Sequence, residues 1–443
     1  MKTLEKTKVF VIGAGISGVS CAHRLMELNK DYEVTIFEAS NEYGGRIKSL
    51  KNFASFDIEL GGEEIHGNNN HYYKLAEKCG GKIFEYWEKN EIYANYKEEL
   101  CSFDKSDIPE IKRIREMFDD ISYEFNHTYE DITLREYLNK YNYSTEVHHI
   151  ANAMLGVEAG TDLDSASAYG FNDISRRWKS GEDNYLISNL SHINVMEKSF
   201  PEAIKKIKFN CAINSIDYSQ ENKVVLTDSK DNVYEGHKCI LTIPITQYQN
   251  KSISFTPAFS KEKTNAFNSI KMDSCAKLVL KFNKIFWPEN TSWILIKGDA
   301  NIYWPTSQGK ISNDILLSSL ISGRSCDNLR QLYKIDKQKF IDKIITDLED
   351  GLLVKNLKDN LVNYFWQDWT SIPFIEGGYT YPSVGEQNVR DIAKQPISNL
   401  IFFGGEAFAL HGHIATIHGA VERGIEAAEE VNQSLNLDLK AKF

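Results

Sequence analysis

A glycine-rich turn near the N-terminus constrains the fold more than any other feature. In "KVFVIGAGISG" a continuous apolar run leads into Gly13, Gly15 and Gly18, and apolar residues at helical spacing follow. "EVTIFEA" then has the composition of a second buried strand, and Glu38 ends it 20 residues after Gly18. Such glycines permit a tight turn, close approach of a pyrophosphate and close helix packing, while the carboxylate can accept the ribose hydroxyls of an adenosine. The pattern predicts a dinucleotide-binding βαβ unit for FAD or NAD, because a carboxylate would repel the extra phosphate of NADP.

The composition is that of an ordinary globular protein. The chain has 443 residues, 42% of them hydrophobic. Its formal net charge of -11 disfavours binding to nucleic acid and favours binding of a cationic ligand. Seven cysteines show no CxxC pair, no run of about 18 apolar residues occurs, and the first residues show no apolar signal core. We therefore expect reduced thiols, no membrane span and a cytoplasmic protein, as a monomer or homodimer.

The order of patterns along the chain predicts an α/β fold with interleaved domains. We expect a Rossmann-type dinucleotide-binding domain from residues 1–71, 191–251 and 385–443, and a substrate domain of mixed β-sheet plus helices from residues 72–190 and 252–384; the family resemblance given below implies that the first is an FAD-binding domain. "EIKRIREMFDDISYEF" predicts an amphipathic helix inside the first substrate segment, for which we find no substrate signature. The second substrate segment has strands rich in aromatic residues and one further helix.

Two more glycine-rich stretches accompany the first. In "YGGRIKS", Arg46 follows Gly44 and Gly45, where it is either a solvated residue in a turn or a charge-assisted contact to the pyrophosphate or flavin end of a cofactor. In "GGEAFALHGHIATIHGAVERG", residues 404–424, small residues open an amphipathic helix. A helix start of this kind lets a large electron-rich group approach free backbone amides.

Seven stretches together carry a family resemblance. "VIGAGISG", "FEAS", "GGRIKS", "ELGGEEIHG", "CAKLVLKF", "WTSIPFIEGGYTYP" and "FFGGEAFALHGHIATIHGAVERG" follow one another in the order of the motifs of flavin-containing amine oxidases. That family includes monoamine oxidases, polyamine oxidases and lysine-specific histone demethylases. The resemblance implies FAD, a two-domain fold, and oxidation of a carbon–nitrogen bond by hydride transfer to flavin N5. It also implies that the imine product hydrolyses and that molecular oxygen reoxidises the flavin to give hydrogen peroxide.

The resemblance also assigns cofactor residues. It implies that Glu406 binds the ribitol chain and that the amides around Ala415 to Ile417 face the flavin C2 carbonyl, where a helix end stabilises negative charge on reduction. The complete set of residues that we expect at the cofactor is Gly13, Gly15, Ile16, Ser17, Gly18, Glu38, Ala39, Gly45, Arg46, Gly62, Glu63, Ile213, Trp369, Gly405, Glu406, Ala415, Thr416 and Ile417.

Lys277 stands in the apolar strand pattern "SCAKLVLKF". It is either an exposed lysine on an edge strand or, as the resemblance implies, a lysine that holds a water at flavin N5 and assists the reaction with oxygen. A lysine inside an apolar strand needs a partner if it is buried.

The aromatic residues of "WQDWTSIPFIEGGYTYP" match the family positions beside the flavin. Trp369 and Tyr379 would guide a neutral amine toward N5. Gly378 stands where monoamine oxidases carry the cysteine that binds flavin covalently, so we expect noncovalent FAD. Thr416 replaces the second tyrosine of the monoamine oxidase cage, which is the choice of polyamine oxidases and histone demethylases.

"ELGGEEIHG" is the substrate-side stretch. It lacks the arginine with which amino-acid oxidases of this superfamily clamp a carboxylate, and His66 matches a histidine of animal polyamine oxidases. Glu63 and Glu64 either suit a cationic substrate or are merely solvated. We therefore expect a small-molecule amine, in the first place a polyamine or similar cation, with Lys277, Tyr379, Trp369, Thr416, His66 and Glu64 as the reacting and substrate residues.

Two alternative functions stay open, and a metal site is not expected. His411, His413 and His418 lack carboxylate or cysteine partners at ligand spacing, so we expect no metal. The same fold could serve an amine dehydrogenase that uses another electron acceptor, or a flavin-bearing binding protein with negligible turnover.

Overall fold

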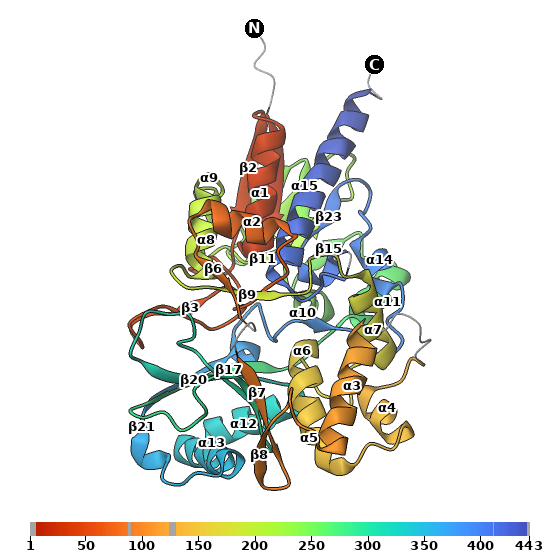
Figure 1. Ribbon diagram of the computed structural model, residues 1–443. Helices are drawn as coiled ribbons and strands as arrows, with labels where there is room; N and C mark the ends of the chain where they lie inside the picture. The colour runs from red at the N-terminus through yellow and green to blue at the C-terminus, as the bar shows by residue number, and fades with distance from the viewer. Residues whose placement is uncertain (1–5, 87–89, 124–129, 411, 441–443) are drawn as a thin grey trace.

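The computed structural model describes residues 6–86, 90–123, 130–410 and 412–440. A parallel sheet with long helices lies at the end of the molecule that carries both termini, and a larger sheet lies at the opposite end (Figure 1). None of the described helices combines the length and the low polarity that crossing a membrane requires.

The parallel sheet is formed by the segments predicted to hold the dinucleotide. Its strand order is β10-β2-β1-β14-β23, with β10 at Ile207–Lys208, β2 at Tyr32–Phe37, β1 at Thr7–Ile12, β14 at Lys238–Leu241 and β23 at Ile401–Phe403. β1 pairs in parallel with both β2 and β14, and α1 (Ile16–Leu28) follows it directly. The predicted βαβ unit is therefore confirmed.

β1 is apolar along its whole length because both of its faces are covered. Val9 and Val11 are buried in a cluster with α1 and α15 (Ile417–Lys440), while Phe10 and Ile12 are buried in a second cluster on the other face. A strand buried on both faces shows no alternation of polar and apolar residues, which is the pattern of "KVFVIG".

The large sheet is mixed, as predicted. Its order is β21-β17-β20-β19-β18-β7-β8, and all of its pairs are antiparallel except β18 with β7. Its strands are β21 (Leu361–Asp368), β17 (Cys275–Phe282), β20 (Ile315–Ser322), β19 (Ile302–Pro305), β18 (Thr291–Leu295), β7 (Glu91–Tyr96) and β8 (Glu99–Ser102). α12 (Gly323–Ile335) and α13 (Lys337–Leu352) pack on one face (Figure 1).

Smaller sheets connect these parts. β13 (Val233–Gly236), β12 (Val224–Asp228), β11 (Ile213–Asp217) and β15 (Ser254–Thr256) form one sheet, and β5 (Ile65–His66), β9 (Asn184–Ile187) and β6 (Ile83–Glu85) form another. The two-stranded pairs are β3 (Ser49–Leu50) with β4 (Ile58–Glu59), and β16 (Lys271–Met272) with β22 (Thr380–Tyr381).

The remaining helices cover the sheets. They are α2 (His71–Lys78), α3 (Pro109–Tyr123), α4 (Leu134–Lys140), α5 (His148–Ala151), the π-helix η2 (Asn152–Gly156), α6 (Val157–Ala159), α7 (Ala168–Arg177), α8 (His192–Ser199), α9 (Pro201–Ile204), α10 (Ile245–Gln249), α11 (Lys261–Ser269) and α14 (Val389–Lys394). The described residues also include four short 3-10 turns: η1 (Thr145–Val147), η3 (Lys358–Asn360), η4 (Trp369–Ser371) and η5 (Glu406–Phe408).

The segment 72–190 holds more than the predicted helices. It also contributes β7 and β8 to the large sheet and β6 and β9 to the three-stranded sheet. The sequence of this segment shows mainly the periodicity of helices. The hairpin of β7 and β8 was not predicted because it depends on pairing with β18, some 200 residues further along the chain. The predicted helix at residues 110–125 is confirmed as far as Tyr123, and its last two residues lie outside the described part.

We propose the two-domain division given above with one adjustment at its boundaries. Tyr72, Ala76, Tyr185 and Ile187 are buried in the same apolar cluster as Val9 of the parallel sheet. We therefore place the ends of the first substrate segment after β6 and before β9. All seven cysteines are free thiols.

Candidate active site

One large cavity lies between the parallel sheet and the mixed sheet. Its volume is about 1490 Å³, which exceeds the roughly 300–1,000 Å³ of an ordinary small-ligand site. It therefore has room for a dinucleotide and a substrate together. The cavity extends from the glycine turn after β1, past β17 and β19, to α3 and α7.

The glycine turn forms one end of the cavity. A Cβ on Gly18 would stand 2.0 Å from the carbonyl oxygen of Gly13, so this glycine lets α1 pack tightly against the turn. A Cβ on Gly15 would have no protein atom nearer than 4.0 Å and would occupy the cavity space instead. Gly13 itself has a φ of +104°, which L side chains rarely adopt.

Glu38 is held at the edge of the same end. Its Oε2 accepts a hydrogen bond from the amide of Ala14 at 2.8 Å, and its Oε1 accepts from the amide and hydroxyl of Ser40 at 2.9 and 2.8 Å. Ala39 and Ile213 line the cavity beside it. Ser40 thus orients the carboxylate of Glu38.

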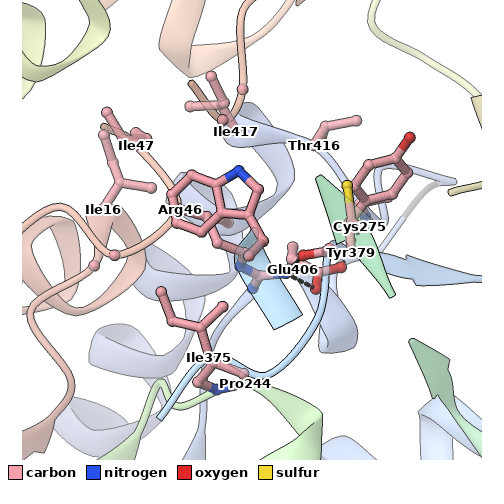
Figure 2. A pocket seen from close by; sticks show the side chains of 18 of the residues that line it. Ile16, Arg46, Ile47, Pro244, Cys275, Ile375, Tyr379, Glu406, Thr416 and Ile417 are labelled. Atoms are coloured by element: carbon pink, nitrogen blue, oxygen red, sulfur yellow. Dashed lines mark hydrogen bonds and ion pairs between the residues drawn. The ribbon is translucent and has the colours of Figure 1, made fainter. Parts of the chain in front are cut away.

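Arg46 forms an ion pair with the buried carboxylate of Glu406 (Figure 2). An Arg46 guanidinium nitrogen donates to Glu406 Oε1 and to the carbonyl of Gly378, both at 2.8 Å. Glu406 also accepts from the Thr380 hydroxyl at 2.7 Å and from the amide of Ala415 at 3.0 Å. Burial opposes ionisation of Glu406, but Arg46 and Thr380 outweigh it and lower its pKa. Arg46 is thus not the solvated turn residue that the sequence left open.

The start of α15 also reaches the cavity. Thr416 caps the helix, because its hydroxyl accepts from the amide of Gly419 at 3.0 Å and donates to the carbonyl of His413 at 2.8 Å. The amides of Ile417 and His418 lie in the first helical turn, where a helix offers no acceptor. Thr416 lines the cavity, but its hydroxyl is used within the helix cap.

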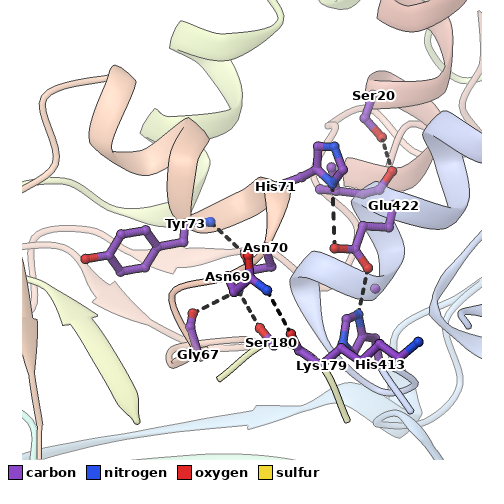
Figure 3. A network of polar contacts seen from close by, with 12 residues as sticks. Ser20, Gly67, Asn69, Asn70, His71, Tyr73, Lys179, Ser180, His413 and Glu422 are labelled. Atoms are coloured by element: carbon purple, nitrogen blue, oxygen red, sulfur yellow. Dashed lines mark hydrogen bonds and ion pairs between the residues drawn. The ribbon is translucent and has the colours of Figure 1, made fainter. Parts of the chain in front are cut away.

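A polar network fixes this helix start from outside the cavity (Figure 3). Glu422 of α15 accepts from His413 Nδ1 at 2.7 Å and lies 3.6 Å from His71 Nδ1 of α2. His413 and His418 pack edge-on against Trp178, which lines the cavity. The described residues contain no cluster of histidine, cysteine and carboxylate side chains that could bind a metal, and His411 lies outside them.

Lys277 faces the cavity from an interior strand of the large sheet. Its strand β17 pairs with β20 and β21, so the edge-strand alternative is wrong, and the side chain is 1% exposed. Alternation along the strand puts Lys277 and Cys275 on the cavity face and Leu278 on the face covered by α12 and α13. The lysine Nζ donates to Glu63 Oε2 at 2.6 Å.

The predicted aromatic residues lie on the same wall. Trp369 is buried and donates from Nε1 to the carbonyl of Leu60 at 2.8 Å. The Tyr379 hydroxyl donates to the carbonyl of Val157, and its ring lies against Gly160, where a Cβ would stand 2.4 Å from it. Both rings therefore have fixed positions at the cavity.

Three acidic side chains line the substrate side of the cavity. Glu63 is paired with Lys277, whereas Glu64 and Glu158 line the cavity without such an ion pair to a lysine or arginine among the described contacts. His66 Nδ1 lies 2.7 Å from Asn184 Oδ1 and 4.0 Å from Glu64 Oε2. Sequence reasoning missed Glu158, because "GVEAG" carries no chemical pattern and only the fold brings it to the cavity.

The predicted residues converge on this one space. Of all the residues assigned above to cofactor or substrate, Gly18 alone does not line the cavity, and it acts through packing. The arrangement fits FAD: open space above Gly15, a carboxylate at the end of β2, and helix amides at the start of α15 lie along one continuous surface. Their individual roles toward the cofactor stay predictions.

Comparison with known proteins agrees with this geometry. The sequence matches the model of the family "Flavin containing amine oxidoreductase" over residues 16–432. It is 25% identical to polyamine oxidase 4 of Oryza sativa subsp. japonica, with 96% of this chain and 89% of that protein covered. It is 23% identical to human lysine-specific histone demethylase 2, with 97% of this chain and 54% of the demethylase covered, so the chain spans about half the length of that relative.

The fold has solved counterparts as well. A putrescine oxidase structure bound to putrescine superposes with a TM-score of 0.82 at 17% identity, covering 97% of this chain and 99% of that one. At this identity the likeness concerns the fold. Because the family match extends over nearly the whole chain, the chain belongs to the flavin-containing amine oxidoreductases, and the cofactor of its cavity is FAD.

Proposed function

We propose that the protein oxidises a cationic amine, in the first place a polyamine or another diamine, and passes the electrons to molecular oxygen to give hydrogen peroxide. The bound FAD supplies the chemistry by accepting a hydride from the carbon next to nitrogen. The chain's own residues bind the amine, orient that carbon and exclude water. The observation that carries the proposal is the pair of carboxylates Glu64 and Glu158 on the substrate side of the cavity.

The electrostatics of these carboxylates favour a cation. Burial, together with the negative charge of Glu63, raises the pKa of Glu64 to about 7, although Lys277 acts in the opposite direction. Burial and the charge of Glu64 also raise the pKa of Glu158 against the opposing effect of His66. An ammonium placed between them would stabilise both ionised forms.

The rest of the cavity suits the carbon chain of such a substrate. Beyond the carboxylates the lining is apolar and comes from α3, η2, α7 and the strands of the mixed sheet, with Phe118, Met154, Phe171, Trp293 and Ile302. Among the described lining residues Arg46 is the one arginine, and it is paired with Glu406. Methylene groups thus find apolar contacts, whereas the carboxylate of an amino acid finds no free guanidinium.

Relatives point in the same direction. The proteins with which the chain was compared include a polyamine oxidase and a putrescine oxidase, whose names describe amines with more than one nitrogen. Trp369 and Tyr379 would flank the reacting nitrogen, and Lys277 would stand at the site of oxygen reaction. These placements support the proposal together with the carboxylates.

A substrate panel tests the proposal. Spermine, spermidine and their acetylated forms should reduce the flavin faster at subsaturating concentration than benzylamine or L-leucine in stopped-flow absorbance, with peroxide released under air. Glu64→Gln should raise the KM for the polyamine about 30-fold, since a charge-assisted contact in a partly desolvated site contributes about 2 kcal/mol.

A matched control comes from the same cavity. Glu182 also lines it but is exposed, so Glu182→Gln removes the same charge where solvent screens it and should change KM little. Preferential reduction by benzylamine or L-leucine would overturn the polyamine proposal. Flavin reduction without peroxide would indicate a dehydrogenase, and no reduction by any amine would indicate a binding protein.

A further inference from the structure

We propose that Glu63 is a positioning residue that pairs with Lys277 and thereby lowers the positive charge that the cavity presents to the flavin. Through this pair, Glu63 would set how readily the cofactor accepts electrons and how fast it returns them to oxygen. The part that concerns oxygen rests on the proposed function, whereas the part that concerns the cofactor's potential does not.

The lysine of this ion pair is buried, its carboxylate is 16% exposed, and both have well-defined partners. Lys277 Nζ donates to Glu63 Oε2 at 2.6 Å and lies 4.1 Å from the centre of the Trp304 ring. Trp304 Nε1 donates to the same carboxylate oxygen at 3.2 Å. Strands β17 and β19 therefore each direct one donor at a single oxygen of Glu63, and the Trp304 ring also stabilises the ammonium.

The backbone of Glu63 is fixed from the other side by His192. The His192 Nε2 lies 2.8 Å from the carbonyl oxygen of Glu63, and its Nδ1 lies 2.6 Å from the Tyr72 hydroxyl. Burial lowers the pKa of His192 to about 4, so the ring is neutral. A neutral ring that donates from Nε2 to a carbonyl accepts at Nδ1, which is what the Tyr72 hydroxyl requires.

The amide of His192 completes this support. It donates to Glu59 Oε1 at 2.8 Å, so the histidine is held through its backbone as well as through both ring nitrogens. Glu63 is thus constrained at its carbonyl and at its carboxylate. We infer that it is not a mobile surface carboxylate but part of a fixed and largely buried unit.

The electrostatic consequence follows from the short distance. An isolated ammonium in a water-poor cavity would stabilise the negative charge of a reduced flavin several ångströms away and so raise its reduction potential. An ammonium with a carboxylate at hydrogen-bond distance acts as a dipole, whose effect falls off faster with distance. Glu63→Gln keeps a hydrogen-bond acceptor for Lys277 but removes the compensating charge.

The test is a redox titration of the bound flavin without amine or oxygen. Glu63→Gln should shift the equilibrium at least tenfold toward the reduced flavin, which is a rise of about 30 mV for a two-electron couple. Reoxidation of the pre-reduced protein by oxygen should become several-fold faster. Glu63→Asp, which keeps the charge, should stay near the wild-type potential.

Repeating the Glu63→Gln change in a Lys277→Met variant shows whether the shift in flavin potential depends on the Lys277–Glu63 ion pair. Without Lys277 the Glu63 carboxylate loses the partner that holds it at the cavity, so a further change to Gln should alter the potential less than it does with Lys277 present. The melting temperature of the FAD-free double variant should exceed that of FAD-free Lys277→Met, because the double variant buries no unpaired carboxylate.

Three outcomes would overturn the proposal. They are an unchanged or lowered potential in Glu63→Gln, an equal shift with and without Lys277, and a shift as large in the neighbouring variant Glu64→Gln. Because the titration contains no amine, its result is independent of the substrate panel. Failure of the polyamine assignment and failure of this inference can therefore be told apart.

Discussion

Substituting alanine at one or the other of two glycines in the first turn should affect helix packing and cofactor binding separately, because each substitution adds one methyl group at a different place. A Cβ on Gly18 would stand 2.0 Å from the carbonyl oxygen of Gly13 and 2.8 Å from Thr242 Oγ1, so α1 must shift away from β1. Overpacking of this kind costs about 1–3 kcal/mol, partly offset by about 1 kcal/mol from the better helix propensity of alanine. Gly18→Ala should therefore destabilise the FAD-free protein by on the order of 1–2 kcal/mol.

Gly15→Ala provides the matched control, because its methyl group would come no nearer than 4.0 Å to the carbonyl oxygen of Gly44. Gly15 has a φ of -69°, which alanine adopts without strain. The smaller entropy of the unfolded chain stabilises this variant by about 0.4–1 kcal/mol, and the poorer N-cap offsets part of it. Its FAD-free stability should stay near wild type, whereas its affinity for FAD should fall at least tenfold, because the methyl group occupies the cavity.

Thermal unfolding of FAD-free protein and titration with FAD measure the two effects separately. The reasoning would be refuted if Gly18→Ala melted like wild type, or if Gly15→Ala bound FAD as tightly as wild type. A loss of stability in Gly15→Ala as large as in Gly18→Ala would also contradict it. In that case the open space above Gly15 would not be the place where the pyrophosphate approaches.

Further predictions concern the cofactor, oxygen and pH. Acid precipitation should release FAD into the supernatant, because Gly378 cannot form a thioether; flavin that stays in the pellet would contradict this. Lys277→Met should slow reoxidation by oxygen at least tenfold, about 1.4 kcal/mol, and affect anaerobic reduction less, as stopped-flow kinetics would show. Burial of Glu422 is outweighed by His413 and His71, which lower its pKa from 4.5 to about 2. Glu422→Gln should therefore cost on the order of 3 kcal/mol at pH 7 in denaturant unfolding, and the difference should disappear as the pH falls from about 4.5 to 2.

The sequence was informative where the chemistry depends on neighbours in the chain. Gly13, Gly15 and Gly18 predict the turn because their spacing alone decides which backbone shapes are possible. The face on which Lys277 points also follows from strand alternation, once the strand is known to be covered on its other side. Local geometry of this kind needs no knowledge of distant segments.

Contacts between distant segments could not be predicted in the same way. Lys277 and Glu63 are 214 residues apart, and nothing in either stretch identifies the other as its partner. Glu158 reaches the cavity only because η2 and α6 place it opposite the substrate-side stretch, in a segment without a recognisable motif. The role of Thr416 as a helix cap likewise depends on where α15 begins.

The pairing of charges along the cavity wall supports the proposed preference for polyamines. Arg46 is paired with Glu406 and Lys277 with Glu63, so these two cations each face a carboxylate within 3 Å. Glu64 and Glu158 remain as carboxylates whose pKa values are raised by burial and by neighbouring negative charge. A monoamine would satisfy one of them at most while its nitrogen reacts, whereas a diamine brings a second ammonium that stays charged throughout the reaction. Because that second contact is the same before and after hydride transfer, it should affect binding more than the chemical step, which is why KM rather than the rate at saturation is the sensitive quantity.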